Sequence, residues 1–143
     1  MSDRKIVRVE AAMRTQFDRM EGMTTVAEAL RTLRHPQAKA IIIEKRHADD
    51  EFGIVMLSDI GRKVLARDRS PDRMNLYELM SKPYVTVGPE MDVRYCARLF
   101  EQFRLARTPV IKDRNVIGIV SFTDLVVHGF APYLGGPVGN VPD

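Results

Sequence analysis

The stretch GIVSFTDL, residues 118–125, has a near copy in GIVMLSDI, residues 53–60. Each begins with glycine and two β-branched residues and ends with a hydroxyl residue, an aspartate and an aliphatic residue. An apolar run followed by Ser or Thr and Asp is typical of a strand that leads into a helix, because hydroxyl residues cap helices and a first-turn acid favours the helix dipole. The sequence therefore predicts two copies of one strand–helix junction.

The repeat extends well beyond these two stretches. Apolar residues at helical spacing occur in both copies at a constant offset of 67 residues: Val26, Ala29, Leu30 and Leu33 in the first, and Val93, Cys96, Ala97 and Phe100 in the second. The offset falls to 65 at the glycines, because the loop EKRHADDE of the first copy is two residues longer than its counterpart. Each copy then predicts the order β-α-β-β-α, and the fold class is α+β.

The predicted elements have the same order in both copies. Helices are expected at 24–35 and 91–104, strands at 39–44, 53–57, 108–112 and 116–120, and closing helices at 59–67 and 122–130. We expect a first repeat at 6–66, a polar linker at 67–75, a second repeat at 76–130 and a flexible Gly/Pro-rich tail at 131–143. Units this small are marginal alone, so each is expected to bury its apolar face on the other.

Composition excludes several classes of protein. The 143 residues contain no apolar run long enough for a membrane span, and the N-terminus lacks the apolar core of a secretory signal. The single cysteine rules out an internal disulfide and fits a cytoplasmic location. The net charge of +3 is dispersed rather than gathered into a basic stripe, so nucleic-acid binding is not favoured.

No catalytic or metal-binding pattern is present. His35, His47 and His128 are scattered without metal-ligand spacing, and the sequence has no P-loop or other nucleotide-binding glycine motif. Cys96 falls on the apolar stripe of a predicted helix, which indicates a core residue rather than a nucleophile. We therefore predict a protein that is not an enzyme and holds no metal.

The second-copy junction has a structural and a functional interpretation. Ser121 and Asp124 have capping-box spacing, so they could serve only to start a helix. Alternatively, an ionised Asp124 suits the hydroxyls of a ribose, and the backbone N–H groups of a helix start suit a phosphate. Gly118 would permit close approach of a backbone. The chemistry suggests a nucleotide but leaves both interpretations open.

The two ordered copies, together with Met80–Pro83, Val85–Val87 and the Thr-Pro-Val of 108–110, resemble a tandem pair of CBS domains, a Bateman module, over about residues 6–130. The resemblance implies two repeats packed with pseudo-two-fold symmetry, with adenine nucleotide (AMP, ADP or ATP) in the clefts between them. It implies a stand-alone regulatory module that senses energy or metabolite state. The alternative is a ligand-free dimerisation or scaffold module.

The resemblance also implies roles for individual residues. Asp124 would hold the ribose hydroxyls, with Ser121 and Thr123 near the phosphate or ribose. The other expected ligand-binding residues are Thr86, Val87, Arg107, Thr108, Pro109 and Val110. A weaker second site would comprise Ile41, Ile42, Ser58, Asp59 and Arg62, with Met56 in place of Ser121.

A homodimer is the expected assembly. CBS pairs of this kind usually associate through their helices, and this sequence offers a physical motive. Leu99, Phe100 and Phe103 fall together on one predicted helix, which is more apolar surface than one small sheet readily covers. The target protein that such a module would regulate has no signature in the sequence.

Overall fold

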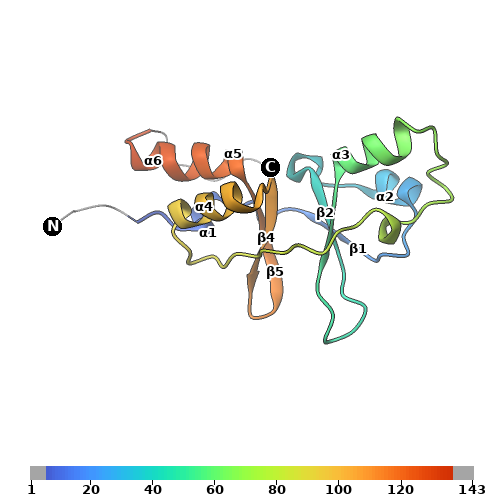
Figure 1. The fold of residues 1–143 in the computed structure, drawn as a ribbon, viewed down its shortest axis with the longest axis horizontal. Helices are drawn as coiled ribbons and strands as arrows, with labels where there is room; N and C mark the ends of the chain where they lie inside the picture. Colours follow the sequence, from blue (N-terminus) through green and yellow to red (C-terminus); the bar gives the residue numbers. More distant parts are fainter. Residues whose placement is uncertain (1–5, 137–143) are drawn as a thin grey trace. The chain divides into compact units, whose positions relative to one another are not determined.

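The computed structural model describes residues 6–136 and divides into two compact units (Figure 1). The first-copy unit comprises residues 16–83. The second-copy unit combines residues 84–136 with residues 6–15 from the start of the chain. Each unit has its own buried core, and each is described by itself.

The first-copy unit is a three-stranded sheet with helices. Strand β1 (Asp18–Met20) pairs in parallel with β2 (Ala40–Ile43), which pairs antiparallel with β3 (Gly53–Met56). Helix α2 (Val26–Thr32) lies between β1 and β2 in sequence, and α3 (Leu57–Ile60) follows β3 and continues as a π-helical segment, Gly61–Leu65. Short 3₁₀ turns cover Pro36–Ala38 and Leu76–Glu78. The fully buried side chains of its core include Ile41, Ile43, Val26, Val55 and Leu76.

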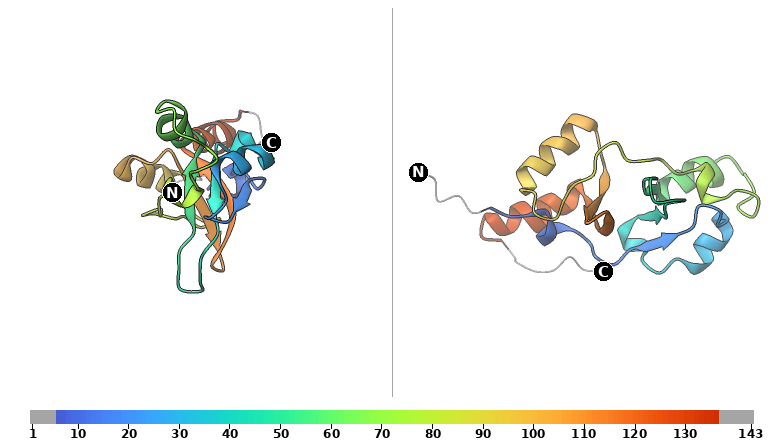
Figure 2. Two further views of the ribbon diagram at one scale, coloured as in Figure 1. Left: turned by 90° about the vertical axis from the view of Figure 1, so that its right-hand side faces the viewer. Right: turned by 90° about the horizontal axis from the view of Figure 1, so that it is seen from below.

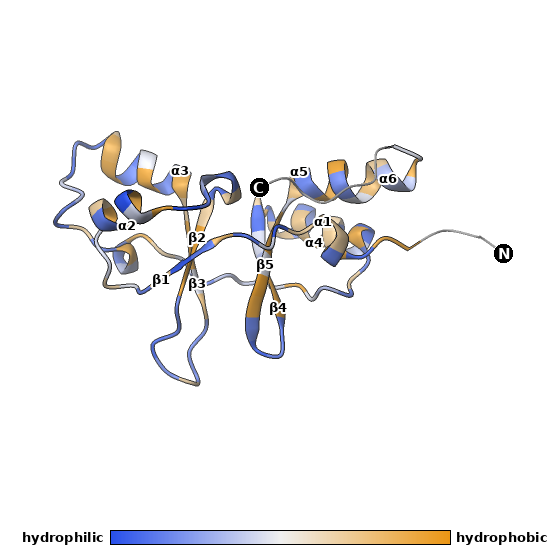
Figure 3. Cartoon of the chain, turned by 180° about the vertical axis from the view of Figure 1, so that it is seen from behind, coloured by the Kyte–Doolittle hydropathy of each residue, from blue (hydrophilic) through white to orange (hydrophobic). Residues whose placement is uncertain are grey.

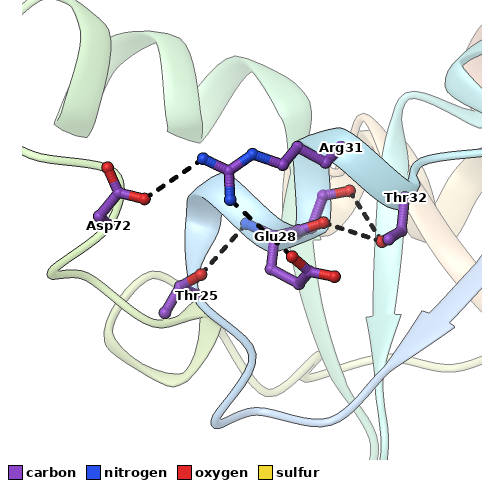
Figure 4. A network of polar contacts seen from close by, with 6 residues as sticks. Thr25, Glu28, Arg31, Thr32 and Asp72 are labelled. Carbon is purple, nitrogen blue, oxygen red and sulfur yellow. Dashed lines mark hydrogen bonds and ion pairs between the residues drawn. The ribbon is translucent and has the colours of Figure 1, made fainter.

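Helix α2 is shorter than the predicted 24–35. Thr25 caps its start by accepting a hydrogen bond from the Glu28 N–H at 3.1 Å, and Arg31 reaches Asp72 at 3.5 Å (Figure 4). The helix ends at Thr32. Beyond it, the buried Asp18 carboxylate accepts hydrogen bonds from the backbone N–H groups of Arg34 at 3.1 Å and His35 at 2.8 Å, so these N–H groups do not continue the helix.

The predicted apolar stripe of α2 is confirmed only in part. Val26 and Ala29 are fully buried, whereas Leu30 is 47% exposed and Leu33 is half-buried. The expectation that Leu30 is a core residue is therefore wrong. Only two of the four residues in the predicted stripe of this shortened helix therefore lie fully in the core.

The second-copy unit is built on a hairpin. Strand β4 (Arg107–Lys112) pairs antiparallel with β5 (Asn115–Ser121), and α4 (Val93–Phe103) precedes them. Helix α5 (Phe122–Asp124) follows β5 and runs into a π-helical segment, Leu125–Phe130, and then α6 (Ala131–Tyr133). The strand expected before α4 is reduced to one parallel bridge between Val87 and Val110.

The apolar face of α4 is mostly core. Val93, Cys96 and Phe100 are buried as predicted, and the Phe100 ring lies 5.4 Å from the Phe122 ring. Leu99 is half-buried, and only Phe103 is substantially exposed, at 45%. The expectation that Leu99, Phe100 and Phe103 form a shared uncovered surface is therefore corrected, because Phe100 belongs to the inner stripe of the helix.

Each copy lends its leading segment (residues 7–15 and 74–82) to the other copy. Arg14 exchanges two backbone hydrogen bonds with Ile119 of β5, at 2.8 and 2.9 Å. Ser81 does the same with Ile54 of β3, at 2.9 and 3.0 Å. These residues are related by the same offsets, 67 and 65, as the sequence repeat. The backbone therefore shows the same repeat as the sequence, except that the leading segment of each copy pairs with a strand of the other copy.

The two compact units do not coincide with the expected repeats of 6–66 and 76–130, or with the expected linker of 67–75. Residues 6–15 pack with the second copy, and residues 67–83 pack with the first. The expected linker is bound rather than free, because Ala27 N–H donates to the Pro71 carbonyl at 3.0 Å and Val26 N–H donates to the Met74 carbonyl at 2.8 Å. The structural units thus differ from the units of the sequence repeat.

The repeated glycines make room for these exchanged segments. A Cβ at Gly118 would lie 2.8 Å from the Arg14 carbonyl oxygen, and a Cβ at Gly53 would lie 2.7 Å from the Met80 sulfur. The expectation that Gly118 permits close approach of a backbone is confirmed, and the backbone that approaches it is that of Arg14.

The loops and the described part of the tail complete the fold. The β2–β3 loop, residues 44–52, extends beyond its strands, and both hairpin loops are hydrophilic (Figures 2 and 3). The expected flexible tail at 131–143 instead begins as helix α6, where the Tyr133 ring stacks on Phe130 and lies under the Arg94 guanidinium. Residues 137–143 lie outside the described residues. None of the helices in residues 6–136 is long and apolar enough to cross a membrane.

Candidate functional site

Asp124 and Ser121 form a complete capping box at the start of α5. The Asp124 N–H donates to Ser121 Oγ at 3.0 Å, and Asp124 Oδ2 accepts from the Ser121 N–H at 3.3 Å. Asp124 is only 6% exposed. The capping interpretation of the sequence spacing is confirmed, and the contact also fixes the direction of a largely buried carboxylate.

Arg14 contacts this carboxylate from the exchanged leading segment. Its Nε lies 3.7 Å from Asp124 Oδ2, and the two side chains are 18% and 9% exposed. The backbone of Arg14 is hydrogen-bonded to Ile119 in β5, and Asp124 follows Ile119 closely in the sequence, at the start of α5. The fold therefore holds the arginine and the aspartate near each other. Sequence reasoning missed Arg14, since no local pattern joins residues so far apart in the chain.

Arg107 brings a second cation to the same place. It begins β4 and lies opposite Ser121 in the hairpin register. Burial lowers the pKa of the Arg107 guanidinium, the Asp124 carboxylate raises it, and the neighbouring Arg14 charge lowers it again. An arginine keeps its proton under such shifts. The site therefore contains one carboxylate and two guanidinium groups, and the structure brings the predicted Arg107, Ser121 and Asp124 together.

The other predicted ligand residues lie in two kinds of environment. The Thr108 hydroxyl is buried and donates to the Val85 carbonyl at 2.6 Å, so its hydrogen holds the segment before α4. Pro109 is buried in β4, and Val87 and Val110 belong to the hydrophobic core. The hydroxyls of Thr86 and Thr123 belong to exposed residues. The side chains of Val87, Pro109 and Val110 are thus used in the core, and only the backbone of these residues is left to contact a ligand.

The corresponding junction of the first copy is arranged differently. Met56 stands at the start of α3 and gives no side-chain cap, and Asp59 instead lies 3.6 Å from Arg62 one turn later. Arg62 is also 3.4 Å from the Ser58 hydroxyl and is 72% exposed. Ile41 and Ile42 are fully buried in β2. The first copy thus lacks the fixed, buried carboxylate of the second.

A polar cavity of about 410 Å³ in the first-copy unit lies elsewhere, and its lining includes Asp18, Arg19, Thr32, Arg34 and His35. None of these residues was predicted as a site residue. The Asp18 carboxylate is engaged by two backbone amides, so its role there is to end α2.

The thiol of Cys96 is a structural group. Cys96 is buried in α4, and burial raises the pKa of its thiol to about 12, which makes it inert at neutral pH. Within residues 6–136, no three His, Cys, Asp or Glu side chains are grouped so that they could hold a metal ion.

Comparison with known proteins matches this chain to one family. The family model described as CBS domain matches residues 76–129. The mitochondrial CBS domain-containing protein CBSX3 of Arabidopsis thaliana is 30% identical over 105 residues, which cover 71% of this chain and 51% of that protein. The chain thus spans about half the length of that curated relative.

Two solved structures show the same fold. A hexameric CBS-CP12 protein from bloom-forming cyanobacteria has a TM-score of 0.79 at 37% identity, covering 87% of this chain and 72% of that one. The CBS domain pair of protein MJ0100, in complex with 5′-methylthioadenosine and S-adenosyl-L-methionine, has a TM-score of 0.69 at 23% identity, covering 85% and 94%. The fold is therefore the mixed α/β fold of a CBS domain pair. The chain belongs to the family of CBS domain proteins.

Proposed function

We propose that this CBS pair is a regulatory module that binds an adenine nucleotide of the AMP, ADP or ATP class at Asp124 and acts as an energy or metabolite sensor. The observation that carries the proposal is a fixed, largely buried carboxylate with two guanidinium groups beside it. An ionised carboxylate accepts hydrogen bonds from both ribose hydroxyls, and guanidinium groups pair with phosphate.

The comparisons support an adenosine ligand. The MJ0100 pair, which shares the fold, was solved with two adenosine derivatives. In the present chain we assign the ribose to Asp124 and the phosphate to Arg107. The Ser121 hydroxyl, which accepts a bond from Asp124 N–H, keeps its own hydrogen for the ligand. Thr86 and Thr123 are exposed and supply further hydroxyls. We place the module in the cytoplasm, since its one cysteine is a buried thiol.

The first copy is proposed as the weaker of two sites. Its Asp59 carboxylate pairs with Arg62 on its own helix and is not fixed by a cap. A nucleotide there would have to compete with this pair without gaining a preformed acceptor.

A thermal-shift panel of AMP, ADP, ATP, GTP, NAD and S-adenosylmethionine tests the function. A ligand at 100 times its dissociation constant stabilises a protein by about 2.7 kcal/mol, which is a shift of several degrees for a protein of this size. We expect the adenine nucleotides to raise the melting temperature. A melting temperature that none of the six ligands raises would refute the proposal.

The second candidate function is a ligand-free dimerisation or scaffold module. It is favoured by exposed apolar side chains on the segment after Asp124, where Val126, Val127 and Phe130 are 52%, 49% and 46% exposed. The CBS-CP12 relative is hexameric. Surface patches of this kind mark interaction sites.

We expect a homodimer under either function. Light scattering should give about twice the 16.3 kDa mass of the chain at micromolar concentration. Phe130→Asp, which puts a charge into the exposed apolar segment, should shift the mass toward that of one chain. A wild-type mass of one chain would exclude the dimer without affecting the nucleotide proposal.

A further inference from the structure

Arg14 reaches Asp124 from the leading segment of the other copy. Its backbone N–H donates to the Ile119 carbonyl at 2.8 Å, and its carbonyl accepts from the Ile119 N–H at 2.9 Å. Its side chain is 18% exposed and ends 3.7 Å from Asp124 Oδ2. The fold therefore fixes the position of this cation beside the carboxylate, because the Arg14 backbone is hydrogen-bonded and its side chain is largely buried.

A ribose on Asp124 changes the electrostatic balance of Arg14. The two ribose hydroxyls would use the same carboxylate that now offsets the Arg14 charge. Arg107 lies close enough for the Arg14 charge to lower its pKa, so the two cations already repel each other. A largely buried guanidinium that shares or loses its carboxylate is costly unless another anion takes that place. Phosphate fits that role because it accepts two parallel hydrogen bonds from a guanidinium.

We infer that Arg14 is a specificity-determining residue of the Asp124 site, which makes the site prefer adenosine ligands that carry a phosphate over uncharged or cationic adenosine derivatives. This inference rests on the proposed function. An uncharged ligand would leave Arg14 to compete with the ribose for Asp124, and a sulfonium ligand would add a third positive charge. The first copy has Ser81 at the position equivalent to Arg14, so its site would not select in this way.

AMP and adenosine form the test pair, because they share base and ribose and differ only in the phosphate. Isothermal titration should show that the wild-type protein binds AMP about 10- to 100-fold more tightly than adenosine, as expected for a hydrogen-bonded charge pair. Arg14→Gln should reduce this ratio to a few-fold, with adenosine bound equally or more tightly. Arg14→Lys keeps the charge without the planar fork and should give an intermediate ratio.

Arg8→Gln is the matched control. Arg8 lies on the same leading segment, and its guanidinium donates to the Glu90 carbonyl at 2.7 Å. Its substitution should leave the AMP-to-adenosine ratio unchanged. Thermal melts without ligand report whether each variant folds, and Arg14→Met, which retains the apolar stem, replaces Arg14→Gln if that variant is unfolded.

The outcomes separate this inference from the function on which it rests. A wild-type ratio near one, or an Arg14→Gln ratio equal to that of the wild type, would overturn the role of Arg14 while adenine binding stands. Failure of the wild-type protein to bind either ligand would overturn the proposed function itself.

Discussion

Replacing Asp124 with alanine is expected to weaken AMP binding by about 30- to 1000-fold. The substitution removes an ionised acceptor from two ribose hydroxyls, and bonds to charged groups contribute about 1.5 to 3 kcal/mol each. Such terms do not add fully, so a total loss of about 2 to 4 kcal/mol is expected, which is the stated range of affinity. Isothermal titration with AMP measures the effect directly.

The same substitution also disturbs the protein, so two comparisons are needed. Asp124→Ala takes away the acceptor of the Ser121 N–H and the partner of Arg14, at a cost of about 1 to 3 kcal/mol in stability. Asp124→Asn keeps an oxygen for Ser121 while removing the charge, and should lose most of the AMP affinity with less unfolding. Asp59→Ala should weaken binding much less, since that carboxylate pairs with Arg62.

Equal losses in Asp124→Ala and Asp59→Ala would mean that the two copies bind nucleotide equivalently. Unchanged binding in both Asp124 variants would leave the Ser121–Asp124 contact as a helix start and nothing more. The two variants of one residue thus separate loss of the fold from loss of the ribose acceptor.

The fold was predictable from the sequence because its main signals are local and occur twice. Eight residues were predicted to face a core from helical spacing alone. Val26, Ala29, Val93, Cys96 and Phe100 are buried, whereas Leu33 and Ala97 are half-buried and Leu30 is exposed. The capping box of Ser121 and Asp124 was likewise visible in their spacing, since its two hydrogen bonds span three residues. Duplication strengthened these signals because the two copies could be compared.

The exchange of the leading segments was not predictable, and the repeat itself is the reason. Arg14 pairs with Ile119 and Ser81 with Ile54. If each segment stayed in its own copy, Arg14 would face Ile54 and Ser81 would face Ile119, and the sequence pattern would be the same. Hydrophobic periodicity carries no information that distinguishes these two pairings.

The composition of the site depended on that exchange. Arg14 approaches Asp124 only because its segment crosses to the second copy, so the residue was absent from the predicted site. The internal use of Thr108 was missed for a similar reason, because its partner is a backbone carbonyl, that of Val85, which has no side-chain signature. Local motifs thus revealed the carboxylate, while its cationic partner and the engaged hydroxyl required the tertiary structure.

Gly118→Ala is expected to destabilise the protein by about 1 to 3 kcal/mol, as overpacked core substitutions do. The new Cβ would lie 2.8 Å from the Arg14 carbonyl oxygen and 2.8 Å from the Met13 sulfur. That carbonyl accepts a hydrogen bond from the Ile119 N–H at 2.9 Å, so the segment cannot retreat without weakening its attachment. Urea unfolding monitored by circular dichroism gives the change in the free energy of unfolding.

Two other glycines supply graded controls for this prediction. Gly53→Ala meets the flexible Met80 side chain at 2.7 Å rather than a backbone atom, so it should cost less than Gly118→Ala. Gly61 has helical backbone angles and nothing within 4 Å of an added Cβ, so Gly61→Ala should stabilise the protein by about 0.4 to 1 kcal/mol. If Gly118→Ala proved no more destabilising than Gly61→Ala, close packing of the exchanged segment would not explain the glycine. If Gly118→Ala is destabilising and also lowers the preference for AMP over adenosine, the glycine acts on the ligand site through the placement of Arg14.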